Sequence, residues 1–459
     1  MSKSFKYLYV LIVLFLTSCC ATNENDNMTY FGGKIINPKS KVVLLYKQDK
    51  LIDSLFLDAN DKFIGAFKNL KENLYTFEHG NEFQHVYVSP QDSILIRLNT
   101  WDFDETLVFS GKGADKNNIL TDWFLEGEKE TKKISNFYKL SPNQFSLKMD
   151  SLLQIRQANI DHFKSRNKTL SEHYLNILDI VANFPIYARY EGYPKRHQQL
   201  KNLKEYPKPP ESFYNFREKI DLNIDSLKYV RQYSRYIAYR LYNNVYDLGI
   251  TRDSSEFLDE LLNEIDANIS NESLKNDFLY EMLVKDFLEK STCGLNKKTF
   301  LNFFKLSSDI EDKKQVQRIQ NDVNNLHGNS PLTSFNITDY LKTRRDVRNI
   351  TSKRNSVIHF WTPKYTSHNY LTKRITYLKN KFPDVNFILV KISDIQTDHV
   401  QGIDIKNQYY LEDTSKANLF LTSKLPRTIL VNEKGTVING YANMRSRIFN
   451  NQVAELQKQ

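Results

Sequence analysis

The stretch Val-Ile-His-Phe-Trp-Thr-Pro-Lys-Tyr-Thr-Ser-His, residues 357–368, decides the fold of the last part of this 459-residue chain. It opens with an apolar strand over residues 357–360, and the helical spacing of later apolar residues predicts a helix over 367–381. Pro383 ends that helix, and the apolar run at 385–392 is typical of a strand buried on both faces of a sheet. The inward face of the helix consists of Leu371, Ile375, Leu378 and Phe382. This order predicts an α/β domain.

The elements that follow extend the pattern. The loop Leu425-Pro426-Arg427-Thr428 leads into predicted strands at 428–431 and 436–438 and a helix over 446–456. The order of strand, helix, strand, proline loop, hairpin and helix resembles the thioredoxin-like domain of lipid-anchored bacterial proteins of the TlpA-like and alkyl hydroperoxide reductase superfamily. That resemblance implies a thioredoxin-like fold over residues 331–459. It also implies a cis peptide bond between Leu425 and Pro426.

The resemblance stops at the reactive thiols. In that family the strand ends in Phe-Trp-Ala, and Trp-Cys-x-x-Cys then opens the helix. Phe360 and Trp361 match the strand end, and counting on from Trp361 puts Tyr365 and His368 at the two thiol positions. Thiol exchange needs a thiolate nucleophile and a second, resolving thiol, which a phenol and an imidazole cannot supply. We therefore predict a redox-inactive domain without catalytic residues, in which a neutral His368 packs near Pro426 on the same helix as Tyr365.

The sequence contains no recognisable motif for a metal site or for another type of catalytic site. His359, His368 and His399 are candidate metal ligands because imidazole is a common ligand, but their spacing matches no metal motif. Neither a Ser-His-Asp order nor a phosphate-binding loop is present. Cys293 precedes Gly294 at a predicted helix end, where the helix dipole disfavours a thiolate, so we expect a structural cysteine. No metal and no other cofactor is predicted.

The N-terminus has the composition of a bacterial export signal. Residues 1–18 combine two lysines with an apolar run of about ten residues, whereas a membrane-spanning helix needs about 20. The ending Leu16-Thr17-Ser18-Cys19 resembles the lipobox of bacterial lipoproteins. That resemblance implies lipidation of Cys19, a tether over residues 19–28 and attachment to a membrane of the cell envelope. We expect the outer membrane, with the protein facing the periplasm or the exterior; a transmembrane anchor is the alternative.

Two further regions precede the C-terminal domain. Residues 29–113 carry short alternating apolar runs between turn residues, which predicts an all-β sandwich or small barrel. They resemble the β-rich module that precedes thioredoxin-like domains in many Gram-negative lipoproteins, although Gln91 in Pro90-Gln91-Asp92-Ser93 replaces the glycine of a characteristic turn. Residues 114–330 have apolar residues at helical spacing, which predicts an all-α middle. The expected fold class is multidomain: an all-β module, an all-α middle and an α/β thioredoxin-like domain.

A stripe of tyrosines marks one helix of the middle region. They lie mostly three or four residues apart, and such spacing places most of the rings on one broad helix face. The stripe comprises Tyr229, Tyr233, Tyr236, Tyr239, Tyr242 and Tyr246. Packing explains it more simply than a site for sugars or aromatic ligands, because tyrosine buries a large ring and keeps its hydroxyl at a wet edge.

The net charge and the absence of recognition motifs limit the classes of partner that this chain could bind. The net charge is +10, and it becomes +8 when Lys3 and Lys6 leave with the signal peptide. No nucleic-acid recognition motif is present, so nucleic acid is not an expected partner. We expect a binding lipoprotein that holds a protein or peptide partner by strand addition between residues 361–368 and 425–428. The alternative is a cell-envelope enzyme related to thiol-disulfide oxidoreductases, with a second protein supplying the thiols.

Overall fold

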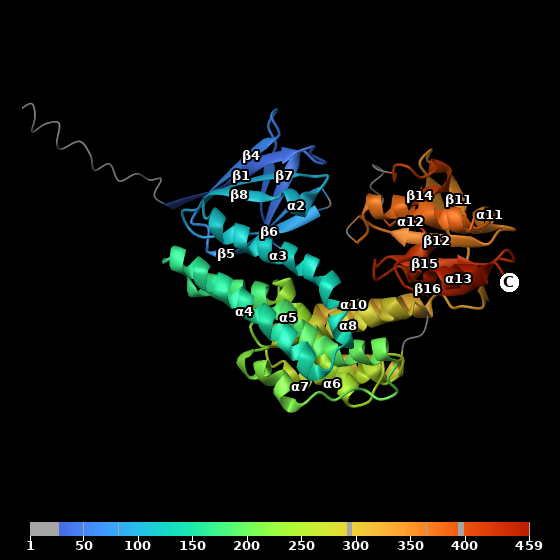
Figure 1. Ribbon diagram of the computed structural model, residues 1–459. Coiled ribbons are helices and arrows are strands. Elements are labelled where there is room, and N and C mark those ends of the chain that lie inside the picture. The colour runs from blue at the N-terminus through green and yellow to red at the C-terminus, as the bar shows by residue number, and fades with distance from the viewer. Residues whose placement is uncertain are drawn as a thin grey trace, which may run out of the picture. The chain divides into compact units, whose positions relative to one another are not determined.

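The computed structural model describes residues 27–48, 50–80, 82–291, 296–363, 365–392 and 399–458. The predicted signal peptide, most of the predicted tether, Cys19, Cys20 and Cys293 lie outside the described residues. The chain divides into two compact units, one of residues 1–190 with 229–236 and one of 191–228 with 237–459. Figure 1 shows both units. None of the helices in the described residues combines the length and the hydropathy needed to cross a bilayer.

The N-terminal module is a sandwich of two four-stranded sheets, as the alternating pattern predicts. One sheet has the order β4-β1-β7-β8 and the other the order β3-β2-β5-β6. The strands are β1 Met28–Ile36, β2 Val42–Lys47, β3 Lys50–Phe56, β4 Lys62–Lys68, β5 Asn73–His79, β6 Glu82–Val88, β7 Ser93–Asn99 and β8 Val108–Lys112. One cluster of buried aromatic and aliphatic residues, Phe31, Leu45, Phe77 and Ile96 among them, fills the module. Two strands, β1 and β4, carry central glycines.

The turn before β7 shows how Gln91 replaces a glycine. Gln91 has a φ of +65°, which lies in the left-handed region that glycine adopts most easily. Its backbone N–H donates to Thr29 Oγ1 at 3.0 Å. Asp92 accepts from Ser89 N at 2.8 Å and from Lys116 Nζ at 3.0 Å. The expected turn therefore forms with a non-glycine residue that its neighbours hold in place.

Helices make up most of the middle region, again as predicted. The short helices are α2 Phe103–Thr106 and the 3-10 turns at Phe137–Lys139, Glu211–Lys219 and Asp225–Leu227. The longer ones are α3 Ala114–Ile134, α4 Pro142–Arg166, α5 Glu172–Lys201, α6 Arg231–Asp247, α7 Phe257–Asn268, α8 Glu272–Lys290, α9 Lys297–Leu306 and α10 Ile310–Asn324. Ser141 caps α4 with a reciprocal bond pattern to Gln144, and Asp309 caps α10.

The tyrosines of α6 pack against other aromatic rings. Tyr233 and Tyr236 are fully buried, and their ring centroids lie 5.9 and 5.4 Å from that of Phe184. Farther along α6, the rings of Tyr242 and Tyr246 lie 5.8 and 5.3 Å from that of Phe257. These contacts support the packing interpretation of the tyrosine stripe.

The C-terminal domain is built on an eight-stranded mixed sheet with the order β11-β10-β14-β13-β12-β15-β16-β9. At its centre β12 runs parallel to β13 and antiparallel to β15, which pairs antiparallel with β16. The strands are β9 Ser330–Pro331, β10 Asn336–Asp339, β11 Arg344–Asp346, β12 Ser356–Trp361, β13 Asn386–Lys391, β14 Gln408–Tyr410, β15 Arg427–Val431 and β16 Thr436–Ala442. The helices are α11 Val347–Thr351, α12 His368–Lys381 and α13 Phe449–Leu456, with 3-10 turns at Ile405–Asn407 and Lys416–Phe420. The order of elements expected from the sequence is confirmed.

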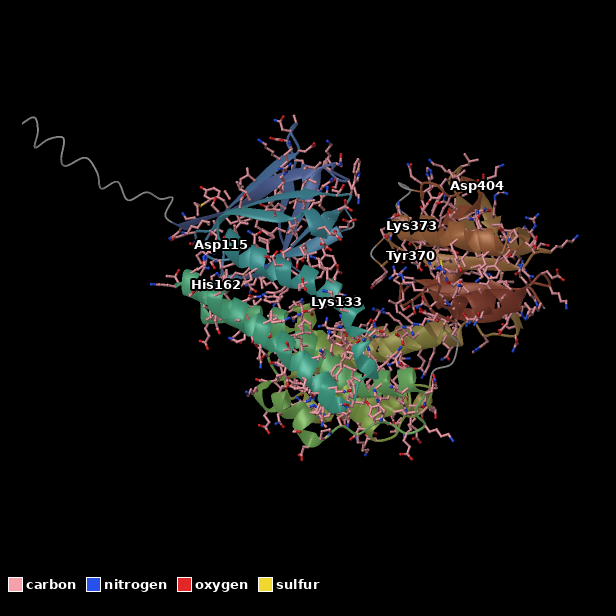
Figure 2. All side chains as sticks on the ribbon, viewed as in Figure 1. Asp115, Lys133, His162, Tyr370, Lys373 and Asp404 are labelled. Atoms are coloured by element: carbon pink, nitrogen blue, oxygen red, sulfur yellow. The ribbon has the colours of Figure 1, made fainter. Side chains whose placement is uncertain are left out.

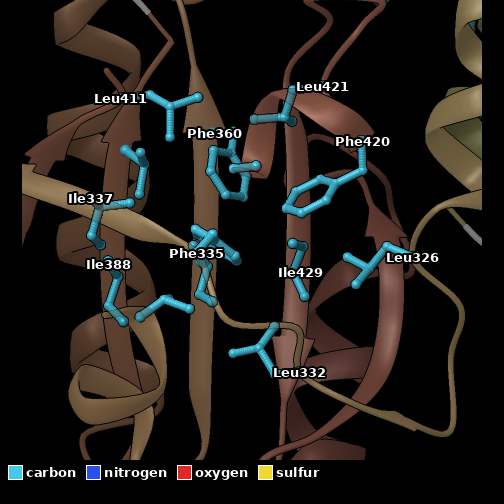
Figure 3. Packing of buried hydrophobic residues seen from close by; sticks show 14 of the residues in the cluster. Leu326, Leu332, Phe335, Ile337, Phe360, Ile388, Leu411, Phe420, Leu421 and Ile429 are labelled. Atoms are coloured by element: carbon cyan, nitrogen blue, oxygen red, sulfur yellow. The ribbon is translucent and has the colours of Figure 1, made fainter. Parts of the chain in front are cut away.

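Both faces of this sheet are buried, which explains why its central strands are apolar throughout. Val357 and Trp361 of β12 pack on one face with Leu371 of α12 and Phe449 of α13. Side chains alternate along a strand, so Ile358 and Phe360 face the opposite side. There they join the cluster shown in Figure 3, with Phe335, Phe420 and Ile429.

Helices of the middle region pack against the C-terminal domain within the second unit. A small buried cluster joins Phe287 of α8 and Ile319 and Val323 of α10 to Leu425 and Tyr441. The rings of Phe287 and Tyr441 meet edge to face at 4.7 Å. The compact unit therefore includes α7 to α10, and it begins well before residue 331.

Candidate functional site

Tyr365 and His368, the residues predicted at the two thiol positions, lie between β12 and the first turn of α12. Trp361 is buried, and its ring meets the His368 ring edge to face at 5.2 Å. Ser367 caps α12 by accepting from Tyr370 N at 3.3 Å, so His368 is the first helical residue. Tyr365 lies before the helix in a turn where its N–H donates to Thr362 O at 3.1 Å. The prediction that Tyr365 and His368 share one helix is therefore wrong, because the cap at Ser367 separates them.

His359 lies on β12, on the same face as Trp361. Its side chain is buried, and Nδ1 lies 2.9 Å from Thr428 Oγ1 on β15. Burial, and secondarily the positive charge of Arg445, lowers the pKa of His359 to about 3. The sheet therefore holds a neutral imidazole at His359.

The proline loop differs from the expectation drawn from the family. No peptide bond in the described residues is cis, so the predicted cis bond between Leu425 and Pro426 is wrong. Trans is the form that most X-Pro bonds adopt. The side chain of Leu425 packs in the cluster with Phe287 and Ile319. Arg427 and Thr428 follow as the first residues of β15.

A buried carboxylate of α10 holds this loop. Asp322 is buried and accepts from the backbone N–H of Thr422 at 2.7 Å and of Ser423 at 3.0 Å. It also accepts from both hydroxyls, each at 2.6 Å. Four donors on one carboxylate fix the loop to α10.

The other backbone groups of the loop are also bonded within the chain. Leu425 N donates to Ser423 Oγ at 3.4 Å, and Lys424 N donates to Leu421 O at 3.1 Å. Gln315 of α10 donates to Ser423 O at 2.7 Å. Each backbone N–H from 422 to 425 therefore has an internal acceptor, and the loop expected to pair with a partner strand is already occupied by the chain's own helix.

Arg427 is a buried cation at the start of β15. Its guanidinium donates to the carbonyl oxygens of Asp322, Phe420 and Gly440. The group also lies 4.4 Å from the Tyr441 ring centroid and 5.2 Å from that of Phe420. Because Asp322 is in the last turn of α10, its carbonyl belongs to the negative end of the helix dipole. Carbonyl dipoles and aromatic ring faces thus stabilise the positive charge of Arg427, which is the third residue of the proline loop.

A basic pocket opens between α12 and the loop before α13. It has a volume of about 600 Å³ and is lined by Tyr370, Arg374, Met444, Arg445, Ser446, Arg447 and Asn450. Figure 2 shows Tyr370 on α12 together with Lys373. The backbone oxygen of Tyr365 accepts from Arg445 Nη2 at 2.9 Å, so the pocket lies next to Tyr365.

Sequence reasoning missed Asp322, Arg374 and Arg445. Asp322 lies about 100 residues before the loop that it holds, and only the tertiary fold brings them together. Arg374 and Arg445 come from segments that contain basic but no acidic residues, 368–381 and 443–448. This local excess of positive charge was the sequence signal that could have pointed to a basic site.

The three histidines considered as metal ligands have separate environments. His359 contacts Thr428, the ring of His368 faces Trp361, and the ring of His399 lies 5.7 Å from that of Tyr340. Over the described ranges, no group of three or more His, Cys, Asp or Glu residues is arranged to hold a metal.

The first unit contains a second hollow, of about 680 Å³, between α3 and α4. Figure 2 shows Asp115 on α3 and His162 on α4, which both line it. At its floor the Glu130 carboxylate pairs with Arg156 at 2.6 Å and with Arg189 at 2.7 Å. None of the site residues predicted from the sequence lies here, and its mixed charge favours no single class of ligand.

Comparisons with known proteins find similarity of fold over part of the chain. No family model matches, and no curated protein matches. A solved structure of a thiol-disulfide oxidoreductase from Bacteroides vulgatus is 17% identical and covers 28% of this chain and 97% of its own, with a TM-score of 0.25. A thiol:disulfide interchange protein from Bacteroides sp. is 18% identical over 28% of this chain and 90% of its own, with a TM-score of 0.24. A DsbE-type protein from Chlorobium tepidum is 9% identical over 29% of this chain and 96% of its own, with a TM-score of 0.25.

Proposed function

We propose that this chain is an exported, lipid-anchored protein of the cell envelope whose thioredoxin-like domain binds a protein or peptide partner without redox chemistry. The substitution of both thiols by Tyr365 and His368 carries the proposal. A reductase needs a thiolate at the first of these positions, and a phenol with a pKa near 10 is not a substitute.

The geometry around these residues supports the same conclusion. In a reductase the loop before the proline must receive a substrate chain, whereas here Asp322 and Gln315 of α10 occupy its backbone groups. Leu425 is buried beneath α8 and α10. A partner would therefore reach this end of the domain beside Tyr365 and the basic pocket, and not by strand addition along residues 422–425.

The competing hypothesis is an envelope enzyme related to thiol-disulfide oxidoreductases. The solved structures that resemble part of the chain carry that description, which concerns their own chemistry. Such an enzyme would need thiols from another protein, because the sequence from residue 294 onward contains no cysteine.

Insulin reduction by the full chain separates the two hypotheses. We expect no dithiol-dependent turbidity above the reductant background, and no change in Cys293→Ser. The matched comparison is the double variant Tyr365→Cys/His368→Cys, because activity confined to it would show that the surrounding site still supports exchange. Turnover of the unmodified chain comparable to that of a thioredoxin control would contradict the proposal.

A further inference from the structure

Three arginines converge on the basic pocket without a carboxylate to neutralise them. Arg374 comes from α12, and Arg445 and Arg447 come from the loop before α13. No acidic residue lines the pocket, and none of the ion pairs in the described part of the chain involves these arginines. Like charges repel, so such a group favours an anion from outside.

Neutral groups hold two of these arginines in place. Arg374 donates from Nε to Met444 O at 3.2 Å and from Nη2 to Asn450 Oδ1 at 3.0 Å. The Arg445 guanidinium lies 4.7 Å from the ring centroid of Tyr370, and it donates to Tyr365 O. Backbone carbonyls, an amide and a ring fix their geometry and leave the full positive charges in place. This arrangement lowers the ordering cost of binding an anion.

The surroundings add to the positive potential. The 14-residue helix α12 contains four basic residues, Lys373, Arg374, Lys379 and Lys381, and no acidic one. Its N-terminus, which carries the positive end of the helix dipole, lies next to the pocket through Tyr370 in the first turn. Arg447 is exposed and has no partner in the described residues.

The rim of the pocket has the character of a protein-binding surface. Tyr365, Tyr377 and Ile448 are 37%, 45% and 42% exposed, respectively. Asn450 bridges Tyr377 and Arg374, because its amide nitrogen lies 3.3 Å from the Tyr377 hydroxyl. Tyrosine and arginine are the residues that most often dominate binding energy in protein interfaces. A guanidinium also matches the planar carboxylate in a two-point contact.

We propose that Arg374, Arg445 and Arg447 bind the side-chain carboxylates of an acidic peptide segment of a partner protein, next to the exposed ring of Tyr365. This assignment rests on the proposed binding function and names the chemistry of its partner. A phosphate-bearing ligand would offer a similar charge without using the apolar rim, and the experiment below separates the two.

The test measures the affinity of the full chain for fluorescein-labelled hexaglutamate by anisotropy, with hexaglutamine as the neutral reference. Arg445→Gln/Arg447→Gln removes two guanidinium groups and should weaken hexaglutamate binding about tenfold or more, because charge-assisted hydrogen bonds to the carboxylates are lost. Arg447→Gln alone should weaken it about threefold or more; its side chain is exposed, so folding should be unaffected. Lys373→Gln removes the same charge from exposed α12 surface outside the pocket and should change the affinity less than about twofold.

Three results would overturn the assignment. They are absence of hexaglutamate binding, equal weakening by Lys373→Gln and Arg447→Gln, and displacement by inorganic phosphate at an equal concentration of charge. Insulin reduction on the same preparation tells the two proposals apart. A preparation that reduces insulin and binds hexaglutamate refutes only the redox-inactive function, whereas one that does neither refutes only the acidic-peptide site.

Discussion

At the scale of single residues, His359 illustrates how the fold changes the chemistry of a side chain. Burial and the charge of Arg445 lower its pKa to about 3, so the folded protein keeps the imidazole neutral where the unfolded chain binds a proton below about pH 6.5. The unfolded state then holds more protons between pH 6.5 and 3. The contribution of this group to stability is therefore complete above pH 6.5 and is lost as the pH falls.

His359→Gln tests this linkage, because glutamine can still bond to Thr428 but does not titrate. Between pH 6.5 and 5 the unmodified chain should lose about 2 kcal/mol more free energy of unfolding than the variant, since each pH unit contributes up to about 1.4 kcal/mol. Urea titrations followed by circular dichroism at both pH values measure the difference. His162→Gln, at an exposed position on α4, is the control and should keep the full pH dependence. Equal losses in His359→Gln and the unmodified chain would contradict the pKa assignment.

At the scale of elements, the attachment of α10 to the proline loop depends on one carboxylate. Asp322→Ala leaves four donors of Thr422 and Ser423 without their acceptor in a buried place, and each unsatisfied group costs roughly 1–3 kcal/mol. We expect a loss of about 3 kcal/mol or more in the free energy of unfolding, together with faster hydrogen exchange in α10.

The matched control on the same helix is Glu311→Ala. Glu311 is exposed and pairs with Lys314 one turn away, so its removal should cost less than about 0.5 kcal/mol. Comparable losses in the two variants would mean that the Asp322 bonds do not hold the helix.

The strongly patterned elements were predictable from the sequence, and the contacts between distant segments were not. The prediction placed three elements within one or two residues of their observed bounds: the strands at 357–360 and 385–392 and the helix at 367–381. The strands were recognisable because a strand buried on both faces of a sheet needs a continuous run of apolar residues. Asp322 and Arg445 were missed because their partners lie about 100 and 80 residues away along the chain.

At the scale of the whole molecule, the prediction concerns the membrane anchor. If Cys19 carries the lipid, Cys19→Ser should abolish incorporation of labelled fatty acid and release the protein from washed membranes into the soluble fraction, because a lipid chain is then no longer buried in the bilayer. Cys20→Ser is the neighbouring control and should leave both labelling and retention unchanged. Membrane retention of Cys19→Ser at the level of the unmodified chain would point to a spanning anchor.

The burial of Leu425 and Arg427 beneath α8 and α10 also limits how this domain can be inherited or engineered. A fragment that starts at residue 331 would expose Leu425 and Tyr441 and would remove the Asp322 carbonyl and carboxylate that the loop depends on. Gene fusions or domain swaps that cut the chain at that point would join a foreign protein to a C-terminal domain with an incomplete core. The smallest fragment that could be exchanged as a unit therefore begins before α8, because it must include the helices α8 and α10 that pack on the proline loop.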